Sequence, residues 1–210
     1  LPDWDLRNFS LAAVAGALAS ARFLTEYLAR TGREGEAQGY RDAADWIRDQ
    51  VDRHFLDRAS GCRHTTLHPD GTPSPFPILP HRLMPLWLGA AFPEGGERTD
   101  ALSAMADLRP DTGFLPVCPG VNEGFPGHTL GYLLYDLVEM DRPEEETEAV
   151  FRTLVDSGLM GASGTYSEFY GPHGVENSHN LNIFSTGINL EALVRYLSAR
   201  GRRAAGGARP

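Results

Sequence analysis

The 210-residue sequence predicts an all-α protein built from helices that pack in pairs. Three observations lead to this fold class. Apolar residues recur at steps of three and four, glycine or proline follows the periodic stretches, and long irregular segments separate them. The composition, with 41% hydrophobic and 22% charged residues, is that of an ordinary globular chain. We therefore expect one domain over residues 1–200, followed by a disordered tail over residues 201–210.

The first two helices form the clearest pair. The apolar positions of the first helix, residues 10–30, are Leu11, Val14, Leu18, Ala21, Leu24 and Leu28. Gly32 ends this helix and a second follows over residues 36–55, so the short connection predicts an αα-hairpin. Later helices are expected over residues 83–89, 97–108, 128–140, 143–158 and 186–200. The loops between them contain Trp, Tyr, Phe, His and Asn, a composition that favours functional loops over disorder.

Charge and composition exclude several classes of protein. The net charge of −9 repels phosphate, so no nucleic-acid partner is expected. No apolar run approaches the roughly 18 residues of a membrane helix, so no membrane partner is expected. All 19 basic residues are arginine, which excludes a P-loop or Schiff-base lysine. Cys62 and Cys118 are either two buried thiols or one disulfide, so the compartment stays open, with the cytoplasm slightly favoured.

The segment with the strongest chemical signal is GTYSEFYGPHG, residues 164–174. Glu168 stands among Tyr166, Phe169 and Tyr170 and is followed by a Gly-Pro turn. Aromatic faces suit the C–H faces of a sugar ring, and a carboxylate can activate water or stabilise an oxocarbenium-like transition state. The alternative is a surface loop that carries an acid without a function.

This segment resembles the six-hairpin (α/α)6 glycosidases, including the trehalase, glucosidase and rhamnosidase branches. In that family the general base lies late in the chain, in a loop of the form aromatic-x-Glu-x-aromatic-x-Pro-x-Gly, and a helix follows. Here Phe184 stands where the family has Trp. The stretch PGHTLGYLLY, residues 126–135, also resembles a family helix start, with His128 near the place of another Trp. Residues 5–8 and 55–61 resemble the hairpin that follows the family's catalytic acid.

The resemblance implies helical hairpins of an (α/α)6 toroid, inverting hydrolysis by water, and neither a metal nor an organic cofactor. Glu168 would be the general base and Asp5 the general acid. Asp5 can also simply cap the first helix, in which case the acid lies upstream of Leu1. A complete toroid has twelve helices and the sequence predicts about seven, so we expect a partial toroid that lacks its N-terminal hairpins.

Further residues are expected around a sugar pocket. The helix dipole at His128 disfavours its charged form, which suits a neutral hydrogen-bonding role. Each candidate can instead have a purely structural role: Trp87 can belong to the core, and the others can stabilise turns. A metal site at His64 and His68 is not expected, because no helix holds them on one face. The expected substrate-binding residues are Tyr166, Phe169, Tyr170, His179, Asn180, Glu123, His128, Trp87 and Arg82.

Three functions remain open, and carbohydrate is the expected ligand in each. The first is an inverting glycoside hydrolase that acts on a small glycoside or oligosaccharide. The second is a sugar epimerase or polysaccharide lyase in which His128 and His179 act as acid and base. The third is a non-catalytic carbohydrate-binding toroid. The oligomeric state is not determined by the sequence.

Overall fold

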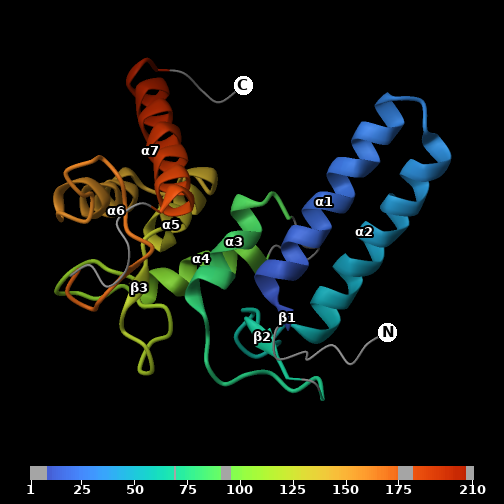
Figure 1. Cartoon of the computed structure of the whole chain (residues 1–210), viewed down its shortest axis with the longest axis horizontal. Helices are drawn as coiled ribbons and strands as arrows, with labels where there is room; N and C mark the ends of the chain where they lie inside the picture. Colours follow the sequence, from blue (N-terminus) through green and yellow to red (C-terminus); the bar gives the residue numbers. More distant parts are fainter. Residues whose placement is uncertain (1–8, 69, 91–95, 175–181, 207–210) are drawn as a thin grey trace. The chain divides into compact units, whose positions relative to one another are not determined.

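A computed structural model describes residues 9–68, 70–90, 96–174 and 182–206. Over these residues the chain is all-α, as predicted, with short strands between the helices (Figure 1). The helices are α1 Leu11–Arg30, α2 Glu34–His54, α3 Leu79–Trp87, α4 Gly96–Ala106, α5 Thr129–Glu139, α6 Glu144–Asp156 and α7 Ile183–Ala204. The strands are β1 Phe9–Ser10, β2 Thr66–Leu67, β3 Phe125–Pro126 and β4 Phe169–Tyr170. The chain divides into two compact units, Leu1–Asp100 and Ala101–Pro210.

The first unit begins with the predicted αα-hairpin. Ser10 caps α1, because its hydroxyl accepts the main-chain N–H of Ala13 at 3.2 Å. Gly32, with a φ of 77°, makes the turn into α2. The buried core between the two helices contains Leu11, Ala15, Leu18 and Ala21 of α1, Ala44 and Val51 of α2, and Phe55.

Helix α1 is long and apolar enough, by length and composition, to cross a membrane. The sequence predicted this helix but gave no expectation that it could span a membrane. One-third of it is buried inside the first unit, and core helices and signal sequences share the same properties, so one such helix is weak evidence of a membrane span.

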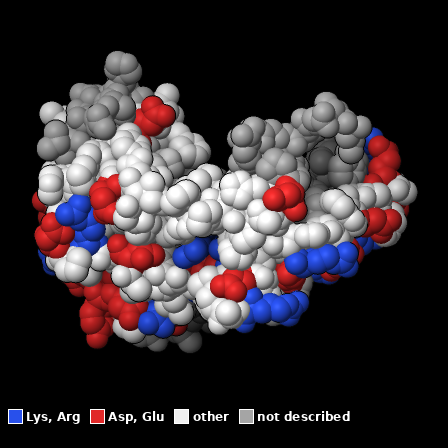
Figure 2. All heavy atoms as spheres, turned by 90° about the horizontal axis from the view of Figure 1, so that it is seen from below, with Lys and Arg blue, Asp and Glu red and all other residues white. Residues whose placement is uncertain are grey.

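A buried arginine joins three segments of the first unit. The Arg63 guanidinium lies 2.9 Å from an oxygen of Asp52 on α2, and the Arg63 main-chain N–H donates to Asp100 on α4 at 2.7 Å. A side chain at Gly96 would overlap the guanidinium, so glycine is required there. Burial raises the pKa of Asp100 to about 6, although Arg63 lowers it in part. On the face drawn in Figure 2, acidic and basic side chains are interspersed.

The same strand and helix order occurs in both units. β1 directly precedes α1 and pairs antiparallel with β2, which lies in the segment before α3. β3 precedes α5 and pairs antiparallel with β4, which lies in the segment before α7. One further main-chain hydrogen bond adjoins each strand pair in the same position. In the first unit the Leu11 N–H donates to the Thr65 carbonyl, and in the second the Gly127 N–H donates to the Glu168 carbonyl, both at 2.9 Å. Thr65 and Glu168 therefore hold equivalent positions, although the two units show no sequence repeat.

Alternate helices in the first unit run parallel. The hydroxyl of Thr65 accepts the N–H of Ile78 at the start of α3, while its carbonyl accepts the N–H at the start of α1. Further along, Arg22 of α1 donates to the carbonyl of Gly89, just beyond α3, at 3.2 Å. Helices α1 and α3 thus begin at the same end, and α2 runs back between them in the chain.

The helices whose ends differ most from the sequence prediction are α3 and α7. α3 begins at Leu79, before the expected residue 83, because Pro80 is well suited to the first turn of a helix. α7 continues to Ala204, so residues 201–204, expected in a disordered tail, are helical. Arg203 holds this last turn, because its guanidinium donates to Asp141 at 2.8 Å.

Candidate active site

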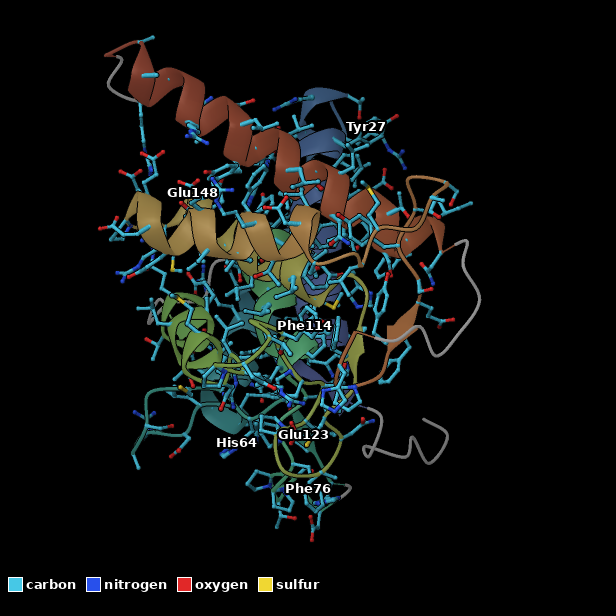
Figure 3. The ribbon with its side chains drawn as sticks, turned by 90° about the vertical axis from the view of Figure 1, so that its left-hand side faces the viewer. Tyr27, His64, Phe76, Phe114, Glu123 and Glu148 are labelled. Carbon is cyan, nitrogen blue, oxygen red and sulfur yellow. The ribbon has the colours of Figure 1, made fainter. Side chains whose placement is uncertain are left out.

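The second unit brings two parallel helices, α5 and α7, together at their N-terminal ends. Near the start of both helices, the Asn189 amide donates to the carbonyl of Gly127 at 2.7 Å. Further along, Arg195 of α7 forms a 2.6 Å ion pair with Glu139 of α5. α6 connects the two helices and packs against both (Figures 1 and 3). The positive dipole ends of α5 and α7 therefore lie on the same side of the unit.

A glycine allows the close approach of these helices. A methyl group at Gly131 of α5 would overlap the side-chain oxygen of Asn189 and would lie 3.1 Å from Ile188. Every residue of α5 from Thr129 to Val138 is buried. The sequence analysis did not single out Gly131 or Asn189. An isolated glycine within a helix and a polar residue on an apolar face were the available signals.

The loops that lead into α5 and α7 are joined by the β3–β4 pair. Phe125 pairs with Tyr170 and Pro126 with Phe169. The rings of Phe125 and Tyr170 also stack, with centroids 5.2 Å apart and an angle of 16° between the planes. These contacts place the loop of His128 beside the loop of Glu168. Both loops were expected from the sequence to lie at a single sugar pocket.

His128 is half-buried and occupies the N-cap position of α5. Its Nδ1 lies 3.3 Å from the hydroxyl oxygen of Ser185, which is fully buried in the first turn of α7. The ring meets Tyr132 and Phe184 edge-on, at centroid distances of 5.3 and 5.0 Å. The imidazole is therefore oriented by contacts from both helices. Ser185 and Tyr132 are contacts of this site that the sequence analysis missed.

Glu168 is exposed, and its main chain is fixed by the bond to Gly127. Two of its aromatic neighbours turn inward instead of flanking the carboxylate. Tyr166 and Tyr170 are each 2% exposed. Their hydroxyls donate to the carbonyls of Leu154 and Leu159, at 3.0 and 2.5 Å. The two tyrosines are core residues of the loop, whereas Phe169 is partly exposed and remains a candidate for contact with a sugar.

A cavity of about 210 Å³ lies at the start of α7. Its lining residues are Thr165, Ile183, Thr186 and Gly187. The Thr186 hydroxyl accepts the main-chain N–H of Tyr166 at 3.0 Å, so the cavity is framed by the loop before α7 and by the first turns of α7 itself.

The other predicted site residues lie outside the described residues, in another turn of the second unit, or in the first unit. Asp5, His179 and Asn180 lie outside the described residues. Glu123 is exposed on a turn that its own carboxylate stabilises, by accepting the N–H of Gly120 at 2.6 Å (Figure 3). Arg82 and Trp87 belong to α3 in the first unit, where both are partly buried.

The described residues also bear on a metal site and on a disulfide. No group of three or more His, Cys, Asp or Glu side chains suited to a metal ion occurs among residues 9–68, 70–90, 96–174 and 182–206. Asp70, near His68, instead accepts bonds from the N–H and hydroxyl of Thr72. Cys62 and Cys118 are free thiols, which answers the question left open by the sequence.

The parallel helices, joined at one end by loops and short strands, are the arrangement of (α/α) toroid proteins, and the predicted fold class is confirmed. The crystal structure of D-mannose isomerase, a member of the (α/α)6 toroid superfamily, is similar to this chain with a TM-score of 0.73 and 14% identity. The match covers 96% of this chain and 57% of that one, so this chain spans little more than half of that protein's length. No protein-family model matches the sequence, and no curated protein matches it.

Proposed function

We propose that this chain carries a sugar isomerase or epimerase site in which His128 transfers a proton at a sugar carbon. The observation that carries the proposal is the position of His128. The imidazole stands where α5 and α7 begin, held by Ser185 through Nδ1. The similarity to D-mannose isomerase supports a sugar as the substrate class. At 14% identity that similarity concerns the fold, so the proposal depends on the chemistry of His128.

A C–H next to a sugar carbonyl is weakly acidic, and its removal gives an enediolate. Returning the proton to the neighbouring carbon, while the hydroxyl proton moves from the oxygen of the first carbon to the oxygen of its neighbour, isomerises the sugar. Returning it to the opposite face of the same carbon epimerises it. Neither reaction needs a further reactant. Histidine suits both steps, because it is readily interconverted between its neutral and charged forms near neutral pH.

In the proposed mechanism, the Ser185 hydroxyl engages Nδ1 of His128 and leaves Nε2 to transfer the proton. If the Nδ1–H donates to the Ser185 hydroxyl in both protonation states, only Nε2 gains and loses a proton. The imidazole then needs no change of tautomer during the reaction. The positive ends of α5 and α7 would stabilise the negative charge that develops on the enediolate oxygen.

A second proton-transfer group is expected for epimerisation, because the two faces of the carbon must both be reached. His179, which the sequence analysis paired with His128, is the proposed partner. It lies outside the described residues, in the segment between Glu168 and α7.

The test is proton exchange in deuterated water, with D-mannose and other aldoses as substrates and NMR as the readout. The variant His128→Asn should lose exchange by about 100-fold or more, the usual contribution of a general acid–base group. His173→Asn is the matched control, because His173 is an exposed histidine of the same unit. Undiminished exchange in His128→Asn would refute the proposal, and His179→Asn tests the second group.

An inverting glycosidase with Glu168 as general base is the second candidate. It is favoured by the exposed Glu168 carboxylate. The hydrogen bond from the Gly127 N–H to the Glu168 main-chain carbonyl also brings the backbone of Glu168 beside the residue that precedes His128. This mechanism needs an acid roughly 6.5–9.5 Å from the base, the role proposed for Asp5. Glu168→Gln should abolish hydrolysis of small glycosides if this candidate is correct, and should affect isomerisation only mildly if it is not. Sugar binding without either reaction would favour the non-catalytic alternative.

A further inference from the structure

One aromatic side chain stands out at the start of α7. Phe184 is the second residue of this helix, and its side chain is 52% exposed. Among the described residues of the second unit it is the only exposed phenylalanine, tyrosine or tryptophan. Single exposed apolar residues are common on protein surfaces and by themselves indicate nothing. The neighbours of Phe184, and not its exposure, therefore carry the argument.

Phe184 is in contact with the imidazole of His128. The two ring centroids lie 5.0 Å apart and the planes meet at 77°, an edge-on arrangement that aromatic rings favour. The next residue, Ser185, is fully buried, and its hydroxyl oxygen lies 3.3 Å from Nδ1 of the same imidazole. Consecutive residues of α7 thus contact one ring, Ser185 from inside the unit and Phe184 from its surface. The orientation of the exposed ring is therefore restricted by His128 as well as by the helix.

An aromatic face beside a histidine suits a closed sugar ring. Where the hydroxyls of a pyranose are equatorial, its faces are covered by axial C–H groups, which carry a partial positive charge because oxygen is bonded to the same carbons. The face of an aromatic ring carries the negative part of its quadrupole, so the two surfaces attract each other. Proton transfer requires the reacting carbon to lie about 3–3.5 Å from Nε2 of His128. A pyranose ring is comparable in width to the distance of 5.0 Å between the two centroids, so a sugar at the imidazole comes within reach of Phe184.

We propose that Phe184 binds the substrate by stacking against the C–H face of a pyranose, next to the imidazole of His128. This inference rests on the proposed function and adds the form of the sugar that the site recognises, which is the closed ring before it opens to expose the carbonyl. Sugars with one uninterrupted C–H face, such as D-glucose and D-mannose, are favoured. Open-chain polyols have no such face. Phe184 is thus a binding residue, and its loss weakens binding more than it slows proton transfer.

Saturation-transfer NMR of the whole chain with D-mannose tests the stacking contact. Transfer should be strongest at the ring protons of one face of the sugar. Phe184→Ala should raise the Kd for D-mannose about tenfold, the size expected of one aromatic stacking contact. In the exchange assay the same variant should raise KM with little change in kcat. The open-chain polyol D-mannitol should bind the wild type and Phe184→Ala equally weakly.

Three further variants separate stacking from other effects. Phe184→Trp keeps a flat aromatic face and should retain the affinity for D-mannose. Phe184→Leu keeps an apolar side chain without that face and should bind as weakly as Phe184→Ala. Phe76→Ala is the matched control, because Phe76 is a phenylalanine of the first unit with 53% exposure, and its Kd should equal that of the wild type. Nitrogen NMR of His128 shows whether the imidazole keeps its tautomer in each variant.

The outcomes distinguish this inference from the proposed function. A Kd and a KM that Phe184→Ala leaves unchanged would overturn the stacking contact, while the proton exchange of the wild type would still support the isomerase. Binding that depends on Phe184, without any proton exchange, would support the stacking contact and refute the isomerase. A wild type that binds no sugar would overturn both. Equal binding by Phe184→Leu and the wild type would also overturn the inference, because apolar contact alone would then suffice.

Discussion

Ser185 is the residue on which the orientation of His128 most depends. Its buried hydroxyl lies 3.3 Å from Nδ1, while Asn182 caps the same turn by accepting the Ser185 N–H at 2.8 Å. Both contacts come from the first turn of α7. The His128 side chain therefore depends on a helix that begins more than fifty residues later in the chain.

Ser185→Ala should change the tautomer of neutral His128, because Nδ1 loses its hydroxyl partner. We expect kcat for sugar proton exchange to fall about tenfold, the factor that corresponds to roughly 1.4 kcal/mol for one hydrogen bond, with little change in KM. Nitrogen NMR of the imidazole reports the tautomer whether or not the protein is an isomerase. Ser185→Thr, which keeps the hydroxyl, should restore both properties, and an unchanged tautomer in Ser185→Ala would contradict this role.

Gly131→Ala should destabilise the protein by about 1–3 kcal/mol, because the new methyl group would force α7 away from α5. Alanine is the better helix former, so helix propensity alone predicts the opposite sign. Gly16→Ala in α1 is the matched control. A Cβ there meets nothing within 4 Å, and we expect stabilisation of about 0.5–1 kcal/mol. Urea unfolding measures the free energy of unfolding of both variants. If Gly131→Ala stabilises the protein as much as Gly16→Ala does, the contact between α5 and α7 is not tight at Gly131.

Among the elements, α2 and α4 are coupled through the buried ion cluster of Arg63, Asp52 and Asp100. Gly96 closes over the guanidinium, and Arg82 of α3 contributes a second positive charge near Asp100. A carboxylate enclosed in this way is ionised at a cost, which makes the stability of the first unit depend on pH.

The pKa of Asp100 is raised to about 6 by burial, from an ordinary value of 3.8. The unfolded chain therefore releases this proton near pH 4, whereas the folded chain keeps it until about pH 6. Between these values the folded state binds more protons, so its stability falls as the pH rises. The free energy of unfolding should decline more steeply across this window for the wild type than for Asp100→Asn. Denaturant titrations at several pH values provide the measurement, and identical slopes would contradict it.

Helix type and pairing were predictable, since apolar periodicity is a local property. The bounds of α1, α2 and α5 were predicted to within about two residues. The apolar positions of α1 and α2 face the core on one side, whereas α5 is buried on all sides. The start of α3 and the end of α7 were not predicted as closely. The start of α3 is marked by Pro80, a local signal that the prediction did not use. The last turn of α7 is joined to Asp141 by Arg203, a contact between residues far apart in the sequence.

For the whole molecule, the shared strand and helix order of the two units is the main finding. It depends on main-chain hydrogen bonds, as at Thr65 and Glu168, which constrain side chains little. Two equivalent positions can therefore hold a buried threonine and an exposed glutamate. This explains why the architecture resembles a toroid enzyme at 14% identity, and why the sequence shows the rhythm of hairpins but no repeat.

The sequence by itself determined the all-α class, the helical hairpins and the two loops of interest, because apolar spacing and turn residues act locally. Only the tertiary structure decided how the residues of those loops divide. It buried Tyr166 and Tyr170 in the core, left Glu168 exposed, and joined His128 to Ser185. The physical reason is that burial and orientation come from contacts between α5 and α7, which no local pattern of residues specifies.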